Sequence, residues 1–291
     1  MQVFFKLLYY LYSFEEKLKV MSVFIDFFKK NSVFRANELK DFLEGMGHKD
    51  LDKSTYVALT YHCKNGALIK IRSGLYAVNN AYLNQSINPL VIAGKATEDA
   101  IVAYHSALEL HGIAYTNFNS HVFISDQKSR EFDFQGQNFR SISNPLKHKE
   151  DVDYGVEQAI FNGVEIRRTN LARTVVDVLD RNDLSGGWEE VWRSLDMAVI
   201  FDAEFSVAYA IKLGRASLIA KLGYFFDQRP EHLKIDSNLI EKLLIHKPKN
   251  PYYMDRNMPK NTGVLIHKWA LIVPRYLHEK AWEEPFIDTD I

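Results

Sequence analysis

The amino-acid sequence predicts an α+β protein: an N-terminal winged helix-turn-helix, followed by a mixed body with a small antiparallel sheet and a C-terminal helical group. Two observations lead to this prediction. Residues 21–78 contain three short helical segments and then a hairpin, and two later hairpins precede a run of helices. Because 291 residues are more than a winged helix alone needs, we expect two domains.

The order of its elements supports the winged helix. Apolar residues at helical spacing predict three helices, at Val23–Lys30, Ala36–Glu44 and Asp52–Lys64. In the third helix we expect Asp52 to be the N-cap and the core stripe to consist of Tyr56, Leu59, Thr60 and Cys63. Two apolar runs separated by Ser73-Gly74 then predict a tight hairpin, the wing. This order is typical of DNA-reading modules, although some winged helices bind only protein.

The other face of the third helix carries small or hydrogen-bonding side chains, which are suited to base edges and phosphate oxygens in a major groove. Basic residues at the helix start and on the wing are expected to contact phosphates. The predicted DNA-binding residues are Lys53, Ser54, Thr55, Tyr61, Lys64, Lys70 and Arg72.

Charge is distributed unevenly along the chain. Residues 1–80 hold twelve Lys or Arg against eight Asp or Glu, a balance of +4, whereas the whole chain carries −1 and the remainder therefore −5. The mild positive charge of the N-terminal part is favourable for binding double-stranded DNA, whereas the negative charge of the remainder is unfavourable for it. The excess is modest, so we expect affinity to depend on local placement of the basic groups, and a homodimer on DNA is compatible with it.

The sequence predicts a cytoplasmic protein without a membrane segment. A single cysteine, Cys63, excludes an internal disulfide framework and favours a reducing compartment. The apolar stretch Met1–Tyr12 is interrupted by Lys6, lacks the flanks of a signal peptide and is too short to span a bilayer. We therefore expect residues 1–20 to be an accessory segment, either a helix that packs on the rest of the protein or an upstream start that is not essential.

A polar segment at 79–88 marks the expected boundary between a DNA-binding domain, residues 21–80, and an α+β domain, residues 89–291. Turn signals at Gln135-Gly136 and Asn162-Gly163 predict two hairpins, and alternation predicts a strand at 121–125. Helices are expected at 89–96, 100–110, 171–181, 188–197, 205–213 and 217–226.

Six segments can be compared with a known family: Arg72–Ala77, His105–Gly112, Arg173–Asp180, Gly186–Val191, Leu213–Gly223 and Trp269–Pro274. No single segment is specific, but their order and spacing resemble the AbiEi antitoxin family over about residues 21–275. The resemblance implies a non-catalytic antitoxin of a bacterial abortive-infection, type IV toxin–antitoxin operon used in phage defence. Its head would bind repeats in its own promoter and repress transcription, and its body would oppose a nucleotidyltransferase-like toxin encoded alongside. The resemblance leaves open whether the body contacts the toxin directly, and it does not extend to residues 1–20.

Two charged pairs at i, i+4 spacing have functional alternatives. His105 and Glu109 share a helix face suited to a metal or to acid–base chemistry, but no second histidine lies at that spacing, so we interpret them as a helix-surface or core pair. Arg173 and Asp177 are interpreted as a structural ion pair, with a toxin contact as the alternative. The motif Asp288-Thr-Asp290 has no following strand that could build a metal site, so we expect a tail.

Two alternative functions stay open. A DNA-targeted metal-dependent nuclease would use carboxylates of the strand region with a lysine, from the set Asp126, Lys128, Glu131 and Asp133, although charges near a hairpin end are usually solvated. The other alternative is a transcription factor that senses a small ligand with its body. The favoured prediction is a binding protein with no catalytic residues, metal or cofactor.

Overall fold

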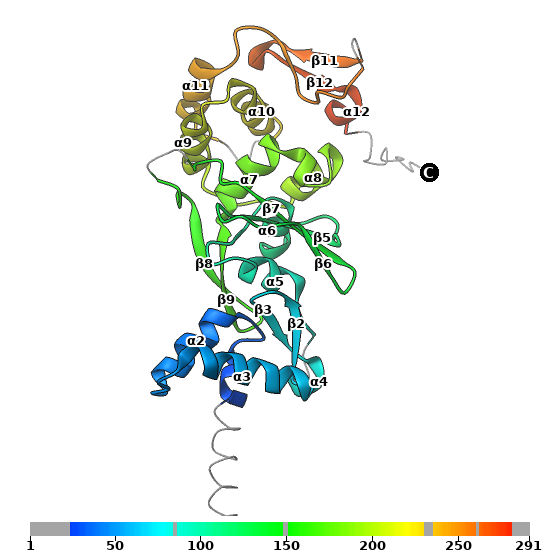
Figure 1. Cartoon of the computed structure of the whole chain (residues 1–291). Helices are drawn as coiled ribbons and strands as arrows, with labels where there is room; N and C mark the ends of the chain where they lie inside the picture. Colours follow the sequence, from blue (N-terminus) through cyan, green and yellow to red (C-terminus); the bar gives the residue numbers. More distant parts are fainter. Residues whose placement is uncertain (1–23, 84–85, 148–150, 230–234, 260–261, 281–291) are drawn as a thin grey trace, which may run out of the picture. The chain divides into compact units, whose positions relative to one another are not determined.

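The computed structural model describes residues 24–83, 86–147, 151–229, 235–259 and 262–280. The chain is a mixed α+β protein, as predicted, and forms two compact units. Of the described residues, the first unit comprises those up to 100 together with 133–137 and 158–167, and the second holds the others. Figure 1 labels the helices and strands of the chain. The predicted accessory segment, residues 1–20, and the predicted tail, residues 288–290, lie outside the described residues. None of the described helices has the length and apolarity needed to cross a bilayer.

The first unit begins with a helical stretch at residues 24–30. It continues with β1 (Val33–Arg35), α2 (Ala36–Gly45), α3 (Leu51–Lys64), β2 (Leu68–Arg72), β3 (Leu75–Val78), α4 (Asn80–Leu83) and α5 (Pro89–Lys95). The strands form an antiparallel sheet in the order β1-β3-β2. The hairpin predicted at Ser73-Gly74 is confirmed, and Gly74 has the positive φ of 77° that favours glycine. Strand β1 was not predicted, because three residues are too few to display alternation.

Aromatic residues dominate the core of the first unit. The rings of Phe24, Phe27 and Phe28 pack with Phe34 of β1, and the Phe27 and Phe34 centroids lie 5.1 Å apart in an edge-to-face arrangement. Leucines and a valine from the helices and the hairpin complete this core: Leu39, Leu43, Leu59, Leu68 and Val78. The core therefore fixes which side of α3 is turned inward.

Helix α5 belongs to the first unit and does not open the second. Lys95 forms an ion pair with Glu38 of α2, with 2.6 Å between Nζ and Oε1. The Arg35 guanidinium donates a hydrogen bond of 3.0 Å to the Thr97 carbonyl. The compact unit consequently extends to residue 100, past the polar segment 79–88 at which we expected the boundary.

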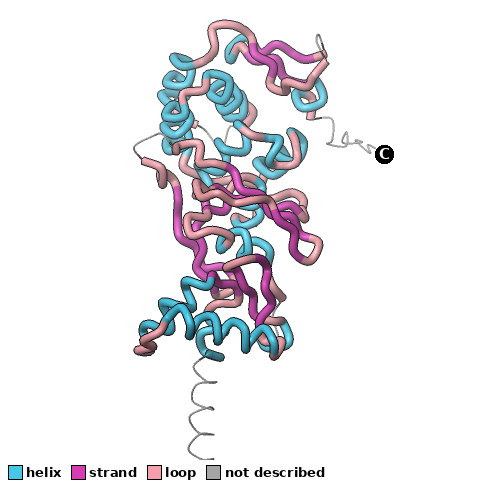
Figure 2. The backbone as a smooth tube through the Cα atoms, in the orientation of Figure 1, coloured by secondary structure: helices cyan, strands magenta, loops and turns pink. Residues whose placement is uncertain are grey.

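A six-stranded sheet follows along the chain. Its strands are β4 (Ile101–Val102), β5 (Ser120–Ile124), β6 (Phe132–Phe134), β7 (Gln137–Ile142), β8 (Val156–Phe161) and β9 (Val164–Thr169), in the order β6-β7-β5-β4-β9-β8. Figure 2 shows the helices of the chain in cyan and its strands in magenta. Both predicted hairpins are present, with positive φ at Gln135, Gly136, Asn162 and Gly163. However, β5 runs parallel to β7 and β4 runs parallel to β9, so the prediction of an antiparallel sheet is wrong. A turn signal specifies the pairing of the two strands that the turn connects. It carries no information on how strands that are distant in sequence pair.

The expected helix at 100–110 is also partly wrong. Ile101 and Val102 form β4, and the helix α6 spans only His105–Leu110. The residues of β4 are completely buried, and a short apolar run of this kind has the same periodicity in a buried strand and in a buried helix.

The helical group agrees closely with the sequence. The structure contains α7 (Leu171–Asp180), the short η1 (Asn182–Leu184), α8 (Trp188–Asp196), α9 (Ala203–Leu213) and α10 (Ala216–Asp227), which confirms the four predicted helices. Beyond them lie α11 (Ser237–His246), β10 (Tyr252–Tyr253), β11 (Gly263–Ile266), η3 (His267–Trp269), β12 (Leu271–Pro274) and α12 (Arg275–His278), for which we predicted no elements. The three late strands form a third sheet in the order β10-β12-β11.

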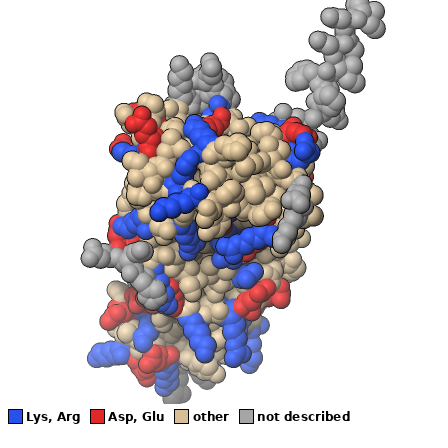
Figure 3. Space-filling model, turned by 90° about the horizontal axis from the view of Figure 1, so that it is seen from above, with Lys and Arg blue, Asp and Glu red and all other residues tan. Residues whose placement is uncertain are grey.

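Charged side chains of both signs are spread over the surface. In Figure 3, Lys and Arg side chains lie on many parts of the face seen from above, with Asp and Glu side chains among them. This mixture agrees with the near-neutral net charge of −1.

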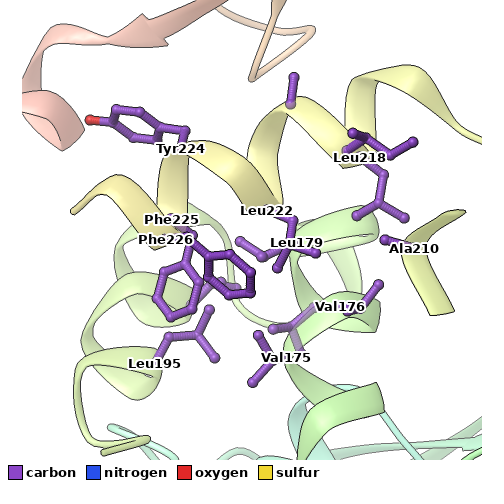
Figure 4. Packing of buried hydrophobic residues seen from close by; sticks show 14 of the residues in the cluster. Val175, Val176, Leu179, Leu195, Ala210, Leu218, Leu222, Tyr224, Phe225 and Phe226 are labelled. Atoms are coloured by element: carbon purple, nitrogen blue, oxygen red, sulfur yellow. The ribbon is translucent and has the colours of Figure 1, made fainter. Parts of the chain in front are cut away.

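The main core of the second unit lies between helices. Val175 and Leu179 of α7, Leu195 of α8 and Phe225 of α10 converge in it (Figure 4). A close approach of two segments distant in sequence occurs at Gly223, where an added Cβ would lie 2.3 Å from the ring of the buried Trp269. Glycine at this position therefore lets the Trp269 ring pack against α10.

Candidate nucleic-acid interface

Helix α3 is fixed at its start by a side-chain cap. The Asp50 carboxylate accepts a hydrogen bond of 3.3 Å from the Lys53 backbone N–H. The predicted cap, Asp52, lies inside the first turn and pairs instead with Lys40 of α2 at 2.6 Å. The prediction of the cap is wrong, although the predicted end of the helix at Lys64 is confirmed.

The buried side of α3 differs from the predicted stripe. Thr55 and Leu59 are each 7% exposed, and the ring of His62 lies 4.9 Å from that of Phe24. Burial lowers the pKa of His62, which favours its neutral form in the core. Tyr56, expected in the core, is 71% exposed. Thr60, also expected in the core, is exposed, whereas Leu59 is buried and Cys63 packs against the core. The predicted stripe is therefore wrong at Tyr56 and Thr60, and the buried face of α3 is displaced by about one residue from the predicted one.

The outward side of α3 forms a continuous surface, which we call the α3 surface. Its members are exposed and recur at helical spacing: Lys53, Tyr56, Val57, Thr60, Tyr61 and Lys64. Three of them, Tyr56, Val57 and Thr60, were missed by the sequence analysis. These three residues could have been found from an alternative core stripe of Thr55, Leu59 and His62, which would place them on the outward side. The alternative stripe was not evident because Tyr56 and Thr60 can be either buried or exposed.

The predicted DNA-binding residues separate into three groups in the structure. Lys53, Tyr61 and Lys64 lie on the α3 surface, and Lys70 is exposed on β2. Ser54 is half-buried. Thr55 is buried, and its hydroxyl has no hydrogen-bond partner among the described residues, so we remove it from the set of predicted contacts.

Arg72 has a partner inside the first unit. Its half-buried guanidinium donates a hydrogen bond to the Ala96 carbonyl, and burial lowers its pKa. This contact ties β2 to the segment after α5. A phosphate contact by Arg72 stays a prediction, but Lys70 on the same strand is the more accessible cation.

The histidine predicted as a helix-surface or core residue lies in the core of the second unit. His105 is 1% exposed, its Nδ1 lies 2.9 Å from Glu109 Oε1, and its Nε2 lies 3.0 Å from Glu190 Oε1. Burial disfavours the Glu190 carboxylate, but hydrogen bonds from the Thr116 N–H and from His105 outweigh burial and lower its pKa. The cluster joins α6 to α8, as expected of a structural pair.

The second predicted pair is also internal. Arg173 Nε lies 3.2 Å from Asp177 Oδ2, and both side chains are buried, which confirms the ion pair. The Tyr209 hydroxyl donates a 2.7 Å hydrogen bond to Asp177, and Arg173 donates to the Tyr154 carbonyl at 2.8 Å. These contacts connect α7 with α9 and leave neither member of the pair available at the surface.

The carboxylates of the nuclease alternative do not assemble into a metal site. Glu131 is exposed and accepts a hydrogen bond from Asn138, and Asp133 is exposed on β6, the edge strand of its sheet. Across the described residues, no group of three or more His, Cys, Asp or Glu is placed to hold a metal ion.

Comparison with known proteins gives a likeness of fold. No family model matches the chain, and the comparison with curated proteins gave no match. Among solved structures, the crystal structure of the RV2827C protein from Mycobacterium tuberculosis is similar, with a TM-score of 0.53 and 13% sequence identity. The match covers 90% of this chain and 94% of that one, so the likeness in fold extends over both units.

Proposed function

We propose that the first unit is a winged helix-turn-helix and that the protein is a cytoplasmic, non-catalytic antitoxin that represses its own promoter. It would belong to a type IV toxin–antitoxin phage-defence operon and oppose a nucleotidyltransferase-like toxin. The observation that carries the proposal is the α3 surface, where lysines and hydrogen-bonding side chains lie on one exposed face of a helix that is followed by the β2–β3 hairpin.

The dimensions of the α3 surface suit a major groove. Lys53 and Lys64 are eleven residues apart, which corresponds to roughly 16 Å along a helix, and the groove is about 12 Å wide. Lysines at the two ends can therefore meet phosphates while Val57, Thr60 and Tyr61 face base edges. Asp52, the acidic residue of the first turn, is paired with Lys40.

The AbiEi-like segments support the antitoxin half of the proposal in a specific way. They supply internal contacts of the second unit: His105, Arg173 and Glu190 are buried and paired, and Gly223 packs against Trp269. These residues stabilise the fold of the second unit and do not form a reaction centre. A domain that acts by binding is expected to have a family sequence pattern of this structural kind.

DNA binding is tested by the salt dependence of affinity. We expect the full-length protein to bind a labelled fragment from its own upstream region more tightly than a shuffled fragment. Lys64→Ala and Lys70→Ala should each lower the log–log salt slope by about 0.9 on both fragments, because each lysine would neutralise one phosphate. Lys30→Ala is the matched control, since Lys30 is exposed on the helical stretch at 24–30 and is not a member of the α3 surface. Unchanged slopes in both variants would contradict the proposal.

Antitoxin activity is tested separately by co-expression with the nucleotidyltransferase-like reading frame that the proposal places beside this gene. We expect wild-type protein to relieve growth arrest and to silence a reporter under its own promoter. The double variant Lys64→Ala, Lys70→Ala should relieve arrest as well as wild type and fail to silence the reporter. Persistent arrest with soluble wild-type protein would refute the antitoxin assignment and leave DNA binding intact.

A further inference from the structure

The second unit contains a cleft that the proposed function does not use. Its volume is about 1040 Å³, and it is bounded by the end of α7 with η1, by the first turns of α8 and α10, by residues 252–257, and by Tyr276. A cleft of this size is sufficient for a ligand as large as a nucleotide.

Lys221 of α10 is the buried cation of this cleft. It is 9% exposed, its Nζ donates a 3.2 Å hydrogen bond to the Leu179 carbonyl, and the same atom lies 4.8 Å from the centre of the Trp188 ring. Within the described part of the chain, no carboxylate lies within ion-pair distance of it. A lysine with one backbone partner retains two N–H donors for another acceptor.

The acidic residues that line the cleft are already engaged. Asp180 is paired with Arg215, and Asp183 is held in two hydrogen bonds of 2.7 and 2.8 Å by Arg181. The Asp255 carboxylate accepts a hydrogen bond of 2.9 Å from the Asn257 N–H. Since most of the negative charge is compensated, Lys221 makes the interior of the cleft favourable for an anion.

Backbone and indole donors point to the same ligand chemistry. Trp188 lines the cleft, is 2% exposed, and its Nε1–H has no hydrogen-bond partner among the described residues. Helices α8 and α10 both begin at the cleft, and neither has a side-chain cap at its N-terminus. The first turn of α10 has no acidic residue, so its N–H groups and helix dipole favour negative charge, whereas Glu189 and Glu190 in the first turn of α8 offset the dipole of that helix. Gly187, the N-cap of α8, has a φ of 89° and ψ of −178°, a conformation that is essentially restricted to glycine.

We propose that this cleft binds a small ligand that combines a phosphate with an aromatic ring, of the nucleotide type. The phosphate would accept hydrogen bonds from Lys221 at the buried end. The ring would stack against the tyrosines of the outer walls, Tyr252 and Tyr276, which are 51% and 44% exposed. This ligand site is independent of DNA binding by the first unit.

Burial of the charged form of Lys221 is energetically unfavourable, and an anionic ligand would offset this penalty. Burial lowers the pKa of Lys221 to about 8, although Asp180, Asp183 and Asp255 favour its charged form and Arg256 opposes it. The protonated lysine therefore destabilises the ligand-free fold. A residue that is costly in this way and lines a cleft is a candidate for function.

The test is calorimetric titration of the full-length protein with 5′-nucleotides carrying each of the four bases, as monophosphates and triphosphates, compared with nucleosides and inorganic phosphate. We expect at least one nucleotide to bind, and Lys221→Met to weaken it by roughly tenfold to hundredfold, the loss of one charge-assisted hydrogen bond. Lys242→Met, on the exposed face of α11, should leave the affinity unchanged. Affinity should fall as pH rises through about 8, where Lys221 loses its proton in the free protein.

A second variant distinguishes loss of a ligand contact from misfolding as the cause of weaker nucleotide binding. Tyr252→Ala, on the exposed wall, should weaken nucleotide binding and leave the weak binding of inorganic phosphate unchanged. Absence of nucleotide binding, or equal affinity of wild type and Lys221→Met, would overturn the proposal. Inorganic phosphate as tight as the best nucleotide would also overturn it, because the ring would then contribute nothing.

Discussion

The orientation of α3 about its own axis can be tested by making the same chemical change on its two sides. Thr55→Val replaces a buried hydroxyl that has no hydrogen-bond partner among the described residues, and Thr60→Val replaces an exposed one. A buried hydroxyl without a partner costs about 1–3 kcal/mol, and valine has nearly the same shape and helix propensity as threonine. We therefore expect Thr55→Val to raise the free energy of unfolding of the first unit by about 1 kcal/mol or more. Thr60→Val should change it by less than about 0.5 kcal/mol.

DNA binding should show the opposite pattern. Thr55 is 7% exposed and cannot reach a groove, so Thr55→Val should bind the promoter fragment like wild type. Thr60 lies on the α3 surface, and loss of its hydroxyl should weaken promoter binding by about 1 kcal/mol, roughly fivefold, if it contacts a base edge or a phosphate.

The two effects need separate measurements. Hydrogen exchange of the backbone amides of residues 51–64 reports the opening free energy of the first unit, whereas Trp188, Trp192 and Trp269 report on the second. Fluorescence anisotropy with labelled promoter DNA gives the affinity. If Thr55→Val weakens DNA binding more than Thr60→Val while both variants remain folded, the face assigned to DNA is wrong.

Two further comparisons test the packing of the second and first units by urea unfolding. Arg173→Met removes one member of a fully buried ion pair and should destabilise the second unit by about 3–5 kcal/mol, whereas Arg275→Met breaks an exposed i, i+4 pair and should cost less than about 1 kcal/mol. Similar losses in the two variants would contradict the assigned burial. Gly223→Ala forces a methyl group into the ring of Trp269 and should cost about 3 kcal/mol or abolish folding. Gly45→Ala, with open space around its Cβ at the end of α2, should instead stabilise by up to about 1 kcal/mol, and a loss of stability there would show that the site is tighter than described.

Local sequence signals were sufficient for most elements of the fold. Gly136, Asn162 and Gly163 in the two hairpin turns adopt the positive φ values that glycine and asparagine tolerate, and the helices from α7 to α10 begin and end within about two residues of the expected positions. These signals operate over a few residues. The parallel pairing of β5 with β7 and of β4 with β9 depends on contacts between distant segments, and no local pattern encodes it.

The cleft of the second unit was not predicted for the same reason. Lys221, Trp188 and Tyr252 come from three elements, and their spacing in sequence matches no motif. Lys221 lies within the apolar run of α10, where the sequence gives no sign that its side chain is buried beside an indole. The site becomes visible only when the helix starts and the late segment 252–257 are brought together.

For α3 the sequence predicts the helix correctly but assigns the wrong side of it to the core. A shift of one residue in the stripe rotates the face by about 100°, which is enough to exchange Thr55 for Tyr56 between the core and the solvent. Both stripes contain residues that can be buried or exposed, so intrinsic hydrophobicity cannot choose between them. Packing against the phenylalanine core determines which stripe of α3 is buried, because the ring of His62 packs beside those of Phe24 and Phe28. The side chains that α3 offers to a partner are thus determined by packing on its opposite side.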